Sequence, residues 1–343
     1  MTRETLFMKA INEGLDQAME RDERVVLLGE DISGGVNVEH LENNNEDAWG
    51  GVMGITRGLM PKYGRERVID TPISEHGYLS ASVGMALTGL RPVPELMFND
   101  FIGFCFDALL GQASKMRYMF GGKAKVPMVV RTMHGAGASA AAQHSGSYYG
   151  LFGLIPGIKV VVPATPYDAK GLLLASIEDD NVVIFSEDKT LYGLKGEVPE
   201  EYYTVPIGKA AVRREGKDLT IVTIGKMLYV AYEVADRLAK DNISVEVIDL
   251  RTVAPWDEET VLNSVKKTGR LIIVDEANPH NNTATDIASV VSDKAFDYLD
   301  GPVKCVCAPN TPVPFATNLE QAYIPDADKV LKVADELIQD LKG

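Results

Sequence analysis

Cysteine is scarce in this sequence. The 343 residues include only Cys105, Cys305 and Cys307. So few thiols do not make a disulfide scaffold, and we therefore expect a reduced, cytoplasmic protein. The apolar runs are short and broken by glycine or charge, and the first residues lack the apolar core of a signal peptide. We expect no membrane-spanning segment and no export signal.

Clustered basic residues are also missing. The 34 lysines and arginines are outnumbered by 49 aspartates and glutamates, which gives a formal net charge of −15. Because nucleic-acid binding needs basic stripes that neutralise phosphates, we expect no nucleic-acid partner. The acidic surface either keeps the protein soluble or docks a basic partner protein, and the residues leave both open.

Two common catalytic patterns do not occur either. The sequence contains no His-Glu-x-x-His pattern and no zinc-type cysteine spacing, which disfavours a zinc site. Ser147 does not lie in a Gly-x-Ser-x-Gly segment, which disfavours a serine hydrolase.

What the chain does contain is an alternation of strand-like and helix-like runs. This alternation predicts an α/β fold with mainly parallel sheets. Buried or extended strands are predicted at 25–30, 91–97, 126–131, 159–163, 182–186, 219–225, 244–250, 271–276 and 303–307. Helices are predicted at 5–20, 79–90, 100–118 and 166–179, with a last helix that places Val330, Ala334, Leu337 and Leu341 on one face.

The pattern lapses twice along the chain. Residues 33–55, which include the acidic stretch Glu42–Asp47, predict a long surface loop. Residues 191–210 lose the alternation and predict a linker. Because the chain is too long for one ordinary core, we expect one domain at 1–190 and another at 211–343.

Glu75 and His144 are the two polar side chains most isolated among apolar and small residues. Glu75 lies at the start of a predicted helix, and the small neighbours of His144 would leave its imidazole accessible. Each also has a structural explanation. Glu75 can complement the helix dipole behind a Ser74 cap, and His144 can be a core histidine. The residues alone leave these alternatives open.

The segment Gly135–Ala140 follows a predicted strand and matches the dinucleotide-binding fingerprint. That motif also needs an acidic residue about 20 positions further on, and no Asp or Glu occurs between Asp107 and Asp168. We therefore expect these glycines to let the backbone pass close to a bulky group. A nicotinamide-dependent dehydrogenase remains an alternative.

Five ordered segments together resemble one family: Asp70–Tyr78, Met119–Gly122, Arg131–Gly137, Ala142–Ser145 and Val245–Thr252. The family is the beta subunit of the thiamine-diphosphate-dependent first component of 2-oxo acid dehydrogenase complexes, within the transketolase-like superfamily. The resemblance runs from about residue 4 to the C-terminus. It implies a pyrimidine-binding domain followed by a transketolase C-terminal-like domain that contacts other subunits and the acyltransferase core.

The resemblance assigns roles to particular residues. Glu75 stands where the family has the glutamate that hydrogen-bonds the aminopyrimidine ring of the cofactor and so favours loss of the thiazolium proton. His144 matches a histidine near the reacting centre that moves protons. The cofactor contacts implied by the resemblance are Glu30, Glu75, Phe101, Met97 and Ile73.

Metals and partners are implied in the same way. The Gly-Asp-Gly motif that holds the diphosphate through a divalent metal, Mg²⁺ in our expectation, is not in this sequence. The resemblance therefore implies an alpha subunit that carries it, an α2β2 heterotetramer and docking to a dihydrolipoamide acetyltransferase core. A structural monovalent cation, K⁺ in our expectation, would map to Met128, Ser176, Ile177, Asp179 and Asn181.

Within the family, Met119–Ala124, Arg131–Met133 and Ala308–Phe315 look most like acetoin dehydrogenase beta subunits. The implied reaction is cleavage of acetoin to acetaldehyde and a hydroxyethyl carbanion on the cofactor, which reductively acetylates lipoyl groups. Pyruvate and branched-chain 2-oxo acid dehydrogenase beta subunits are alternatives. A non-catalytic docking subunit, in which Glu75 only caps a helix, is a further one.

Overall fold

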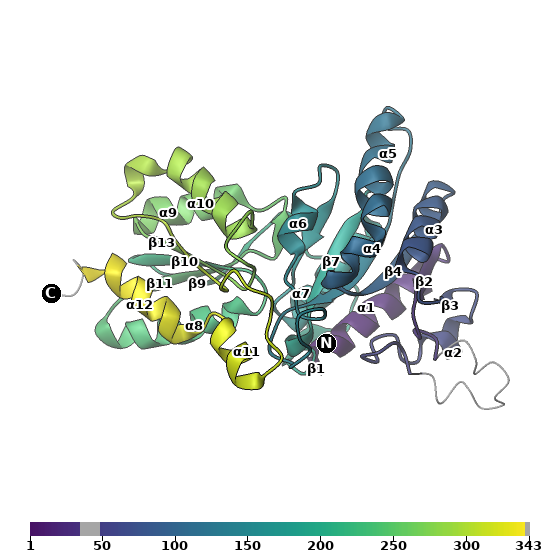
Figure 1. Ribbon diagram of the computed structural model, residues 1–343, viewed down its shortest axis with the longest axis horizontal. Helices are drawn as coiled ribbons and strands as arrows, with labels where there is room; N and C mark the ends of the chain where they lie inside the picture. Colours follow the sequence, from purple (N-terminus) through teal and green to yellow (C-terminus); the bar gives the residue numbers. More distant parts are fainter. Residues whose placement is uncertain (35–48, 340–343) are drawn as a thin grey trace. The chain divides into compact units, whose positions relative to one another are not determined.

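The computed structural model describes residues 1–34 and 49–339. The chain divides into two compact units (Figure 1). The first comprises Met1–His134 and Leu154–Ile207, and the second comprises Gly135–Gly153 and the chain from Gly208 onward. The short segment Gly135–Gly153 therefore belongs to the second unit although it lies in the first half of the sequence. The predicted linker at 191–210 stays a prediction.

The first unit is built on a parallel sheet whose strands run in the order β6-β7-β5-β4-β2-β3. The core of this sheet is dry, because β2, β5 and β7 are buried at every position. Such strands read as continuous apolar runs, which is why the sequence identified them. Their bounds are β2 Val25–Gly29, β3 Val68–Asp70, β4 Arg91–Phe98, β5 Val129–His134, β6 Lys159–Val161 and β7 Val183–Asp188.

Helices cover this sheet. Helix α1 (Phe7–Arg21) packs on α7 (Pro166–Glu178), which begins with a proline behind the Thr165 cap. An antiparallel pair, β1 (Thr2–Leu6) and β8 (Lys195–Pro199), lies beside them. Its side chains are only partly buried, so neither strand has the apolar run by which the sequence could reveal it. Two further helices are α2 Leu59–Tyr63 and α3 Glu75–Leu87.

The helix predicted at 100–118 is present but is not uniform. A 3-10 turn (Asn99–Phe101) leads into α4 (Ile102–Asp107), then into a π-helical segment (Ala108–Ala113) and into α5 (Ser114–Met119). A Cβ at Gly111, within the π-helical segment, would lie 2.3 Å from a side-chain oxygen of Asp107. Single-turn π segments frequently occur at functional sites.

The second unit contains a five-stranded sheet in the order β14-β13-β10-β11-β9, parallel except for β9. Helices α9 and α10 cover one face, and α8 and α12 cover the other (Figure 1). The strands are β9 Ala211–Arg214, β10 Leu219–Thr223, β11 Val245–Asp249, β13 Leu271–Asp275 and β14 Lys304–Cys307, with a short β12 at Thr252–Ala254. The helices are α6 Tyr149–Gly153, α8 Met227–Leu238, α9 Glu258–Thr268, α10 Thr283–Lys294, α11 Thr317–Tyr323 and α12 Ala327–Leu337.

The predicted α/β class with mainly parallel sheets is confirmed. Within the described residues, no helix is long and apolar enough to cross a membrane. In the last helix Val330, Ala334 and Leu337 are buried as expected. Two predictions fall outside the described residues: Glu42–Asp47 with most of the loop around it, and Leu341.

Candidate active site

The carboxyl edge of the first sheet brings two glutamates into electrostatic reach of each other. Glu30 follows the last residue of β2, and Glu75 is the first residue of α3, just after β3. Strands β2 and β3 pair in parallel, with Gly29 opposite Asp70, so the two strands end at the same edge of the sheet. Ligand sites in open α/β sheets form at this edge. Ser74 occupies the N-cap position of this helix as considered, but its side chain makes no cap hydrogen bond.

Glu30 and Glu75 have different surroundings. Glu30 is buried, and its Oε1 has no hydrogen-bond partner within the described structure. Burial raises the pKa of Glu30 to about 7, and the charges of Glu75, Asp31 and Glu95 add to the shift. Glu75 is only half-buried. Near neutral pH the Glu30 carboxyl group is thus partly protonated, while the Glu75 carboxyl group nearby is reached by solvent. Two carboxyl groups in such different surroundings are suited to proton transfer with a ligand.

Apolar and aromatic groups enclose the pair. The Tyr78 hydroxyl donates to the carbonyl oxygen of Glu95 at 3.1 Å. Burial, reinforced by the Glu75 charge, raises the pKa of the Cys105 thiol to about 12, so Cys105 is a neutral wall residue. Phe101 is half-buried and packs edge-on against Phe98, with ring centroids 5.6 Å apart. Its ring is suited to packing against a flat ligand.

A buried ion network lies directly behind these carboxylates. Arg131 in β5 donates to Glu95 at 2.7 Å and to both oxygens of Glu187 at 2.7 and 2.9 Å. The Tyr192 hydroxyl donates to Glu187 at 2.8 Å. The network ties β4, β5 and β7 together beneath the site and places a positive charge beside Glu95. Glu95 and Arg131 lie in the predicted strands 91–97 and 126–131, where a buried charge signals a buried partner, but that partner, Glu187, lies beyond the predicted strand 182–186.

Ile73 and Met97 are the other expected cofactor contacts. Ile73 precedes Glu75 by two positions and is 84% exposed. Met97 lies near the carboxyl end of β4 and is half-buried. An isoleucine this exposed next to a half-buried carboxylate suits contact with a bound molecule or another chain.

The residues expected to hold a monovalent cation lie together around the end of α7 and the start of β7. The carbonyl oxygens of Ile177 and Asp179 both accept from the Arg91 guanidinium, at 2.8 and 3.1 Å. The Met128 carbonyl accepts from the Val183 amide, and the Ser176 carbonyl accepts from the Asp179 amide. This loop therefore already gathers backbone oxygens around a positive group. Potassium binding stays a prediction.

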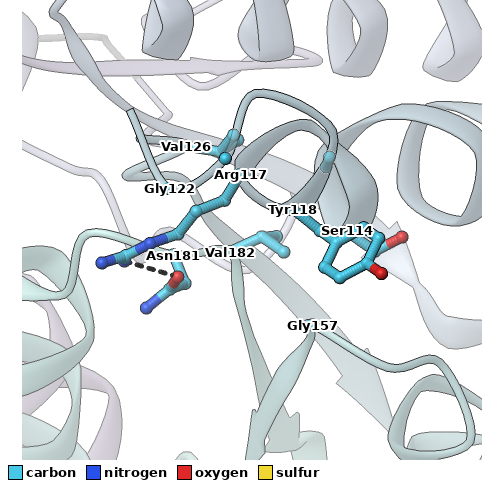
Figure 2. Close-up of a pocket in the computed structure, with 10 residues that line it drawn as sticks. Ser114, Arg117, Tyr118, Gly122, Val126, Gly157, Asn181 and Val182 are labelled. Carbon is cyan, nitrogen blue, oxygen red and sulfur yellow. Dashed lines mark hydrogen bonds between the residues drawn. The ribbon is translucent and has the colours of Figure 1, made fainter. Parts of the chain in front are cut away.

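Asn181, the last residue of that set, borders a cavity of about 460 Å³ beside α5. The Arg117 guanidinium reaches across to the Asn181 side-chain oxygen at 2.8 Å, as Figure 2 shows. Tyr118, Gly121 and Gly122 line the same cavity. Gly121 and Gly122 belong to the Met119–Gly122 segment and Tyr118 directly precedes it, a segment that carried the family resemblance but was not predicted to be a site.

His144 belongs to the second unit. Its imidazole is half-buried, and its backbone N–H donates to Ala141 at 3.3 Å. Upstream of it, the glycine-rich segment directs backbone N–H groups at two carboxylates of the same unit, Glu276 and Glu320. Those donors are thus already used, which argues against the dinucleotide interpretation. That Glu75 and His144 serve one site stays a prediction, since they lie in different units.

Comparison with known proteins identifies the fold and the family. The family model "Transketolase, pyrimidine binding domain" matches residues 4–195, and "Transketolase, C-terminal domain" matches residues 208–330. The chain is 56% identical to the acetoin:2,6-dichlorophenolindophenol oxidoreductase subunit beta of Bacillus subtilis, over 98% of both chains. The corresponding subunit of Cupriavidus necator is 53% identical, over 97% of both chains. This chain belongs to the E1-type beta-subunit family of thiamine-diphosphate-dependent enzymes.

The wider E1-type family is also represented. The pyruvate dehydrogenase E1 component subunit beta of Bacillus subtilis is 41% identical, over 97% of this chain and 98% of that one. A solved split-gene transketolase, described as an inactive beta4 tetramer, superposes with a TM-score of 0.75 at 21% identity, over 97% of this chain and 98% of that one. This last likeness shows the shared fold.

Membership in the E1-type beta-subunit family gives the carboxylate pair its context. A cofactor of this class presents a flat pyrimidine with ring nitrogens, which needs a proton-sharing carboxylate and an aromatic or apolar wall. The unpartnered oxygen of Glu30, the accessible Glu75 and the ring of Phe101 meet that need. The residues present therefore fit the pyrimidine half of thiamine diphosphate.

Proposed function

We propose that this chain is the beta subunit of an acetoin dehydrogenase that depends on thiamine diphosphate and works only with an alpha subunit. The observation that carries the proposal is the Glu30–Glu75 pair at the carboxyl edge of the pyrimidine-binding domain. The substrate assignment is supported by 56% and 53% identity to two acetoin oxidoreductase beta subunits, against 41% to a pyruvate dehydrogenase subunit.

The chain's own residues would bind one end of the cofactor. Glu75 would hold a proton at its carboxylate and share it with a pyrimidine ring nitrogen, while Glu30 behind it stores a proton near neutral pH. Phe101 would pack on the ring, and Met97 and Ile73 would complete the apolar wall. When bound, thiamine diphosphate supplies a carbon nucleophile and an electron sink. His144 would hold or release a proton at the substrate oxygen.

The diphosphate end needs a partner. The sequence contains no Gly-Asp-Gly motif, so we assign the divalent metal, Mg²⁺, to an alpha subunit. Large apolar side chains along α4, α5 and the following turn support a docking surface for it: Phe104, Tyr118, Met119 and Phe120 are 69%, 89%, 66% and 57% exposed. We further propose an α2β2 assembly that docks, through its acidic surface, on a dihydrolipoamide acetyltransferase core. A cytoplasmic location accords with three free cysteines.

We also propose that K⁺ binds the backbone oxygens around Ile177 and Asp179. Backbone oxygens of one short turn support the proposal, and K⁺ would have to displace the Arg91 guanidinium, which now occupies two of them. Thermal unfolding in KCl should then occur at a higher midpoint than in tetramethylammonium chloride of equal ionic strength. Equal midpoints would contradict potassium binding.

The substrate is tested by co-purifying the chain with its alpha partner and assaying an artificial electron acceptor. We expect acetoin to give the highest kcat/KM among acetoin, pyruvate and branched 2-oxo acids. A preference for pyruvate would replace this proposal with the second candidate, a pyruvate dehydrogenase beta subunit, which the 41% identity over nearly the whole chain favours next.

A further inference from the structure

The segment that leads to His144 has an unusual backbone. Gly135 and Gly137 have φ values of 95° and 109°, and the non-glycine residues Ser139 and Ala141 have φ values of 51° and 61°. L-residues rarely adopt this left-handed region, and they hold it only where the surroundings enforce it. The glycines adopt these values freely, but Ser139 and Ala141, two positions apart, mean that something outside the segment holds its shape.

Two buried carboxylates of the second unit supply that restraint. Glu320 is 1% exposed and accepts from the N–H groups of Gly137 at 2.7 Å and Ser139 at 2.9 Å, one on each oxygen. Glu276 is 3% exposed and accepts from the Ala136 N–H at 2.5 Å. Hydrogen bonds to ionised carboxylates are about twice as strong as neutral ones.

Lys226 closes the arrangement. Its ammonium group donates to the Ala136 carbonyl at 2.5 Å and pairs with Glu276 at 2.9 Å. Both backbone groups of Ala136 are thus held by one ion pair. The Ala136 side chain is buried with Ala308, Val313 and Tyr323, so the segment between β14 and α11 and the end of α11 also hold it. The N–H groups of the glycine-rich segment do bind anionic groups, but these groups are the carboxylates of Glu276 and Glu320 in the same chain.

We propose that Glu320 and Glu276 are positioning residues that hold residues 136–139 in the shape that presents His144 to the reaction. The inference rests on the proposed role of His144. Neither glutamate needs to touch substrate or cofactor. Their effect passes through the backbone, because the segment has no helix or strand of its own before α6 and depends on these contacts for its conformation.

The test uses the complete enzyme, with its alpha subunit and cofactor, and compares Glu320→Gln, His144→Ala and the double variant. The matched control is Glu259→Gln, a 78% exposed carboxylate of the same unit. We expect Glu320→Gln to lower kcat about ten- to hundredfold, as displacement of a reacting group does, with little change in the KM for acetoin or in cofactor affinity. In the His144→Ala background the same change should add less than threefold, because both variants impair one function.

Amide hydrogen exchange of peptides covering 135–145 separates the outcomes. Faster exchange in Glu320→Gln than in Glu259→Gln is expected. Unchanged exchange would overturn the restraint itself. Additive losses in the double variant would overturn the link to His144 while leaving the catalytic role of His144 intact. If His144→Ala alone keeps full activity, the proposed role of His144 fails, and the positioning claim fails with it, even if exchange still identifies Glu320 as a structural anchor.

Discussion

At the scale of single residues, Glu30 and Glu75 show how one side-chain type acquires two behaviours. Burial removes Glu30 from water and favours its neutral form, while the first turn of α3 keeps Glu75 half in solvent. The charge of Glu75 adds to the upward shift of the Glu30 pKa. The site therefore offers a proton-holding carboxyl group close to a second, solvent-accessible carboxylate, which a lone helix-capping glutamate would not.

Replacing Glu75 by glutamine removes the proton-sharing group but keeps its size. We expect kcat to fall about 10²–10⁴-fold in the enzyme assembled with its alpha subunit, because general acid–base groups contribute this much. Co-purification with the alpha subunit should be unaffected. The matched control is Glu66→Gln, an exposed carboxylate on the same unit. Near-normal turnover of Glu75→Gln would reject the assigned role.

Glu30 predicts a specific pH dependence of stability. Its folded-state pKa, about 7, lies above the ordinary value of 4.5, so folding favours the protonated form. The unfolded chain binds fewer protons here, and stability must fall as the pH rises from about 5 through 7. Glu30→Gln cannot ionise and should escape this loss. The unfolding midpoint of Glu30→Gln minus that of the unaltered chain should therefore increase between pH 5 and pH 8, and a constant difference would contradict it.

At the scale of elements, the buried network under the site holds three strands in register. Arg131 compensates two buried carboxylates, Glu95 and Glu187, and all three side chains are almost fully inaccessible. The ordering of β4, β5 and β7 at their carboxyl ends depends on it. The charge of Glu95 also contributes to the raised pKa of Glu30, so the network links strand packing to the site.

Arg131→Leu should destabilise the chain by about 3–5 kcal/mol, because it leaves two buried carboxylates without their partner. Urea unfolding of the purified chain measures this. The control Arg214→Leu removes an exposed ion pair with Asp236 and should cost no more than about 1 kcal/mol. Equal losses in the two variants would show that burial of the Arg131 network does not matter.

At the scale of the whole molecule, physical reasons explain which elements could be predicted from the sequence and which could not. Buried strands such as β5, β7 and β10 read as apolar runs, so the α/β class and most element positions could be predicted. Strands β1 and β8 are only partly buried and left no such pattern. Two backbone features could not be predicted from the sequence either. The π-helical segment and the capture of residues 136–139 by Glu276 and Glu320 depend on contacts between residues far apart in sequence.

Some residues of the candidate site could likewise be predicted from the sequence, and others could not. Glu75 and Phe101 could be proposed through the family resemblance, although of the two only Glu75 lies in one of the five recognised segments, Asp70–Tyr78. Arg131 was visible only as part of a motif, because its partners at 95 and 187 are distant in sequence and meet only when β4, β5 and β7 pair. The membership of Gly135–Gly153 in the second unit could not be read from local pattern at all, since nothing in its composition marks a crossing between units.

The central claim is that this chain supplies the pyrimidine half of a shared site and needs another chain for the rest. The most direct measurement is turnover of acetoin with 2,6-dichlorophenolindophenol and thiamine diphosphate, by the purified chain alone and after addition of its alpha subunit. We predict no turnover by the chain alone and full turnover in the mixture, with acetoin preferred over pyruvate. Turnover by the chain alone would contradict the claim.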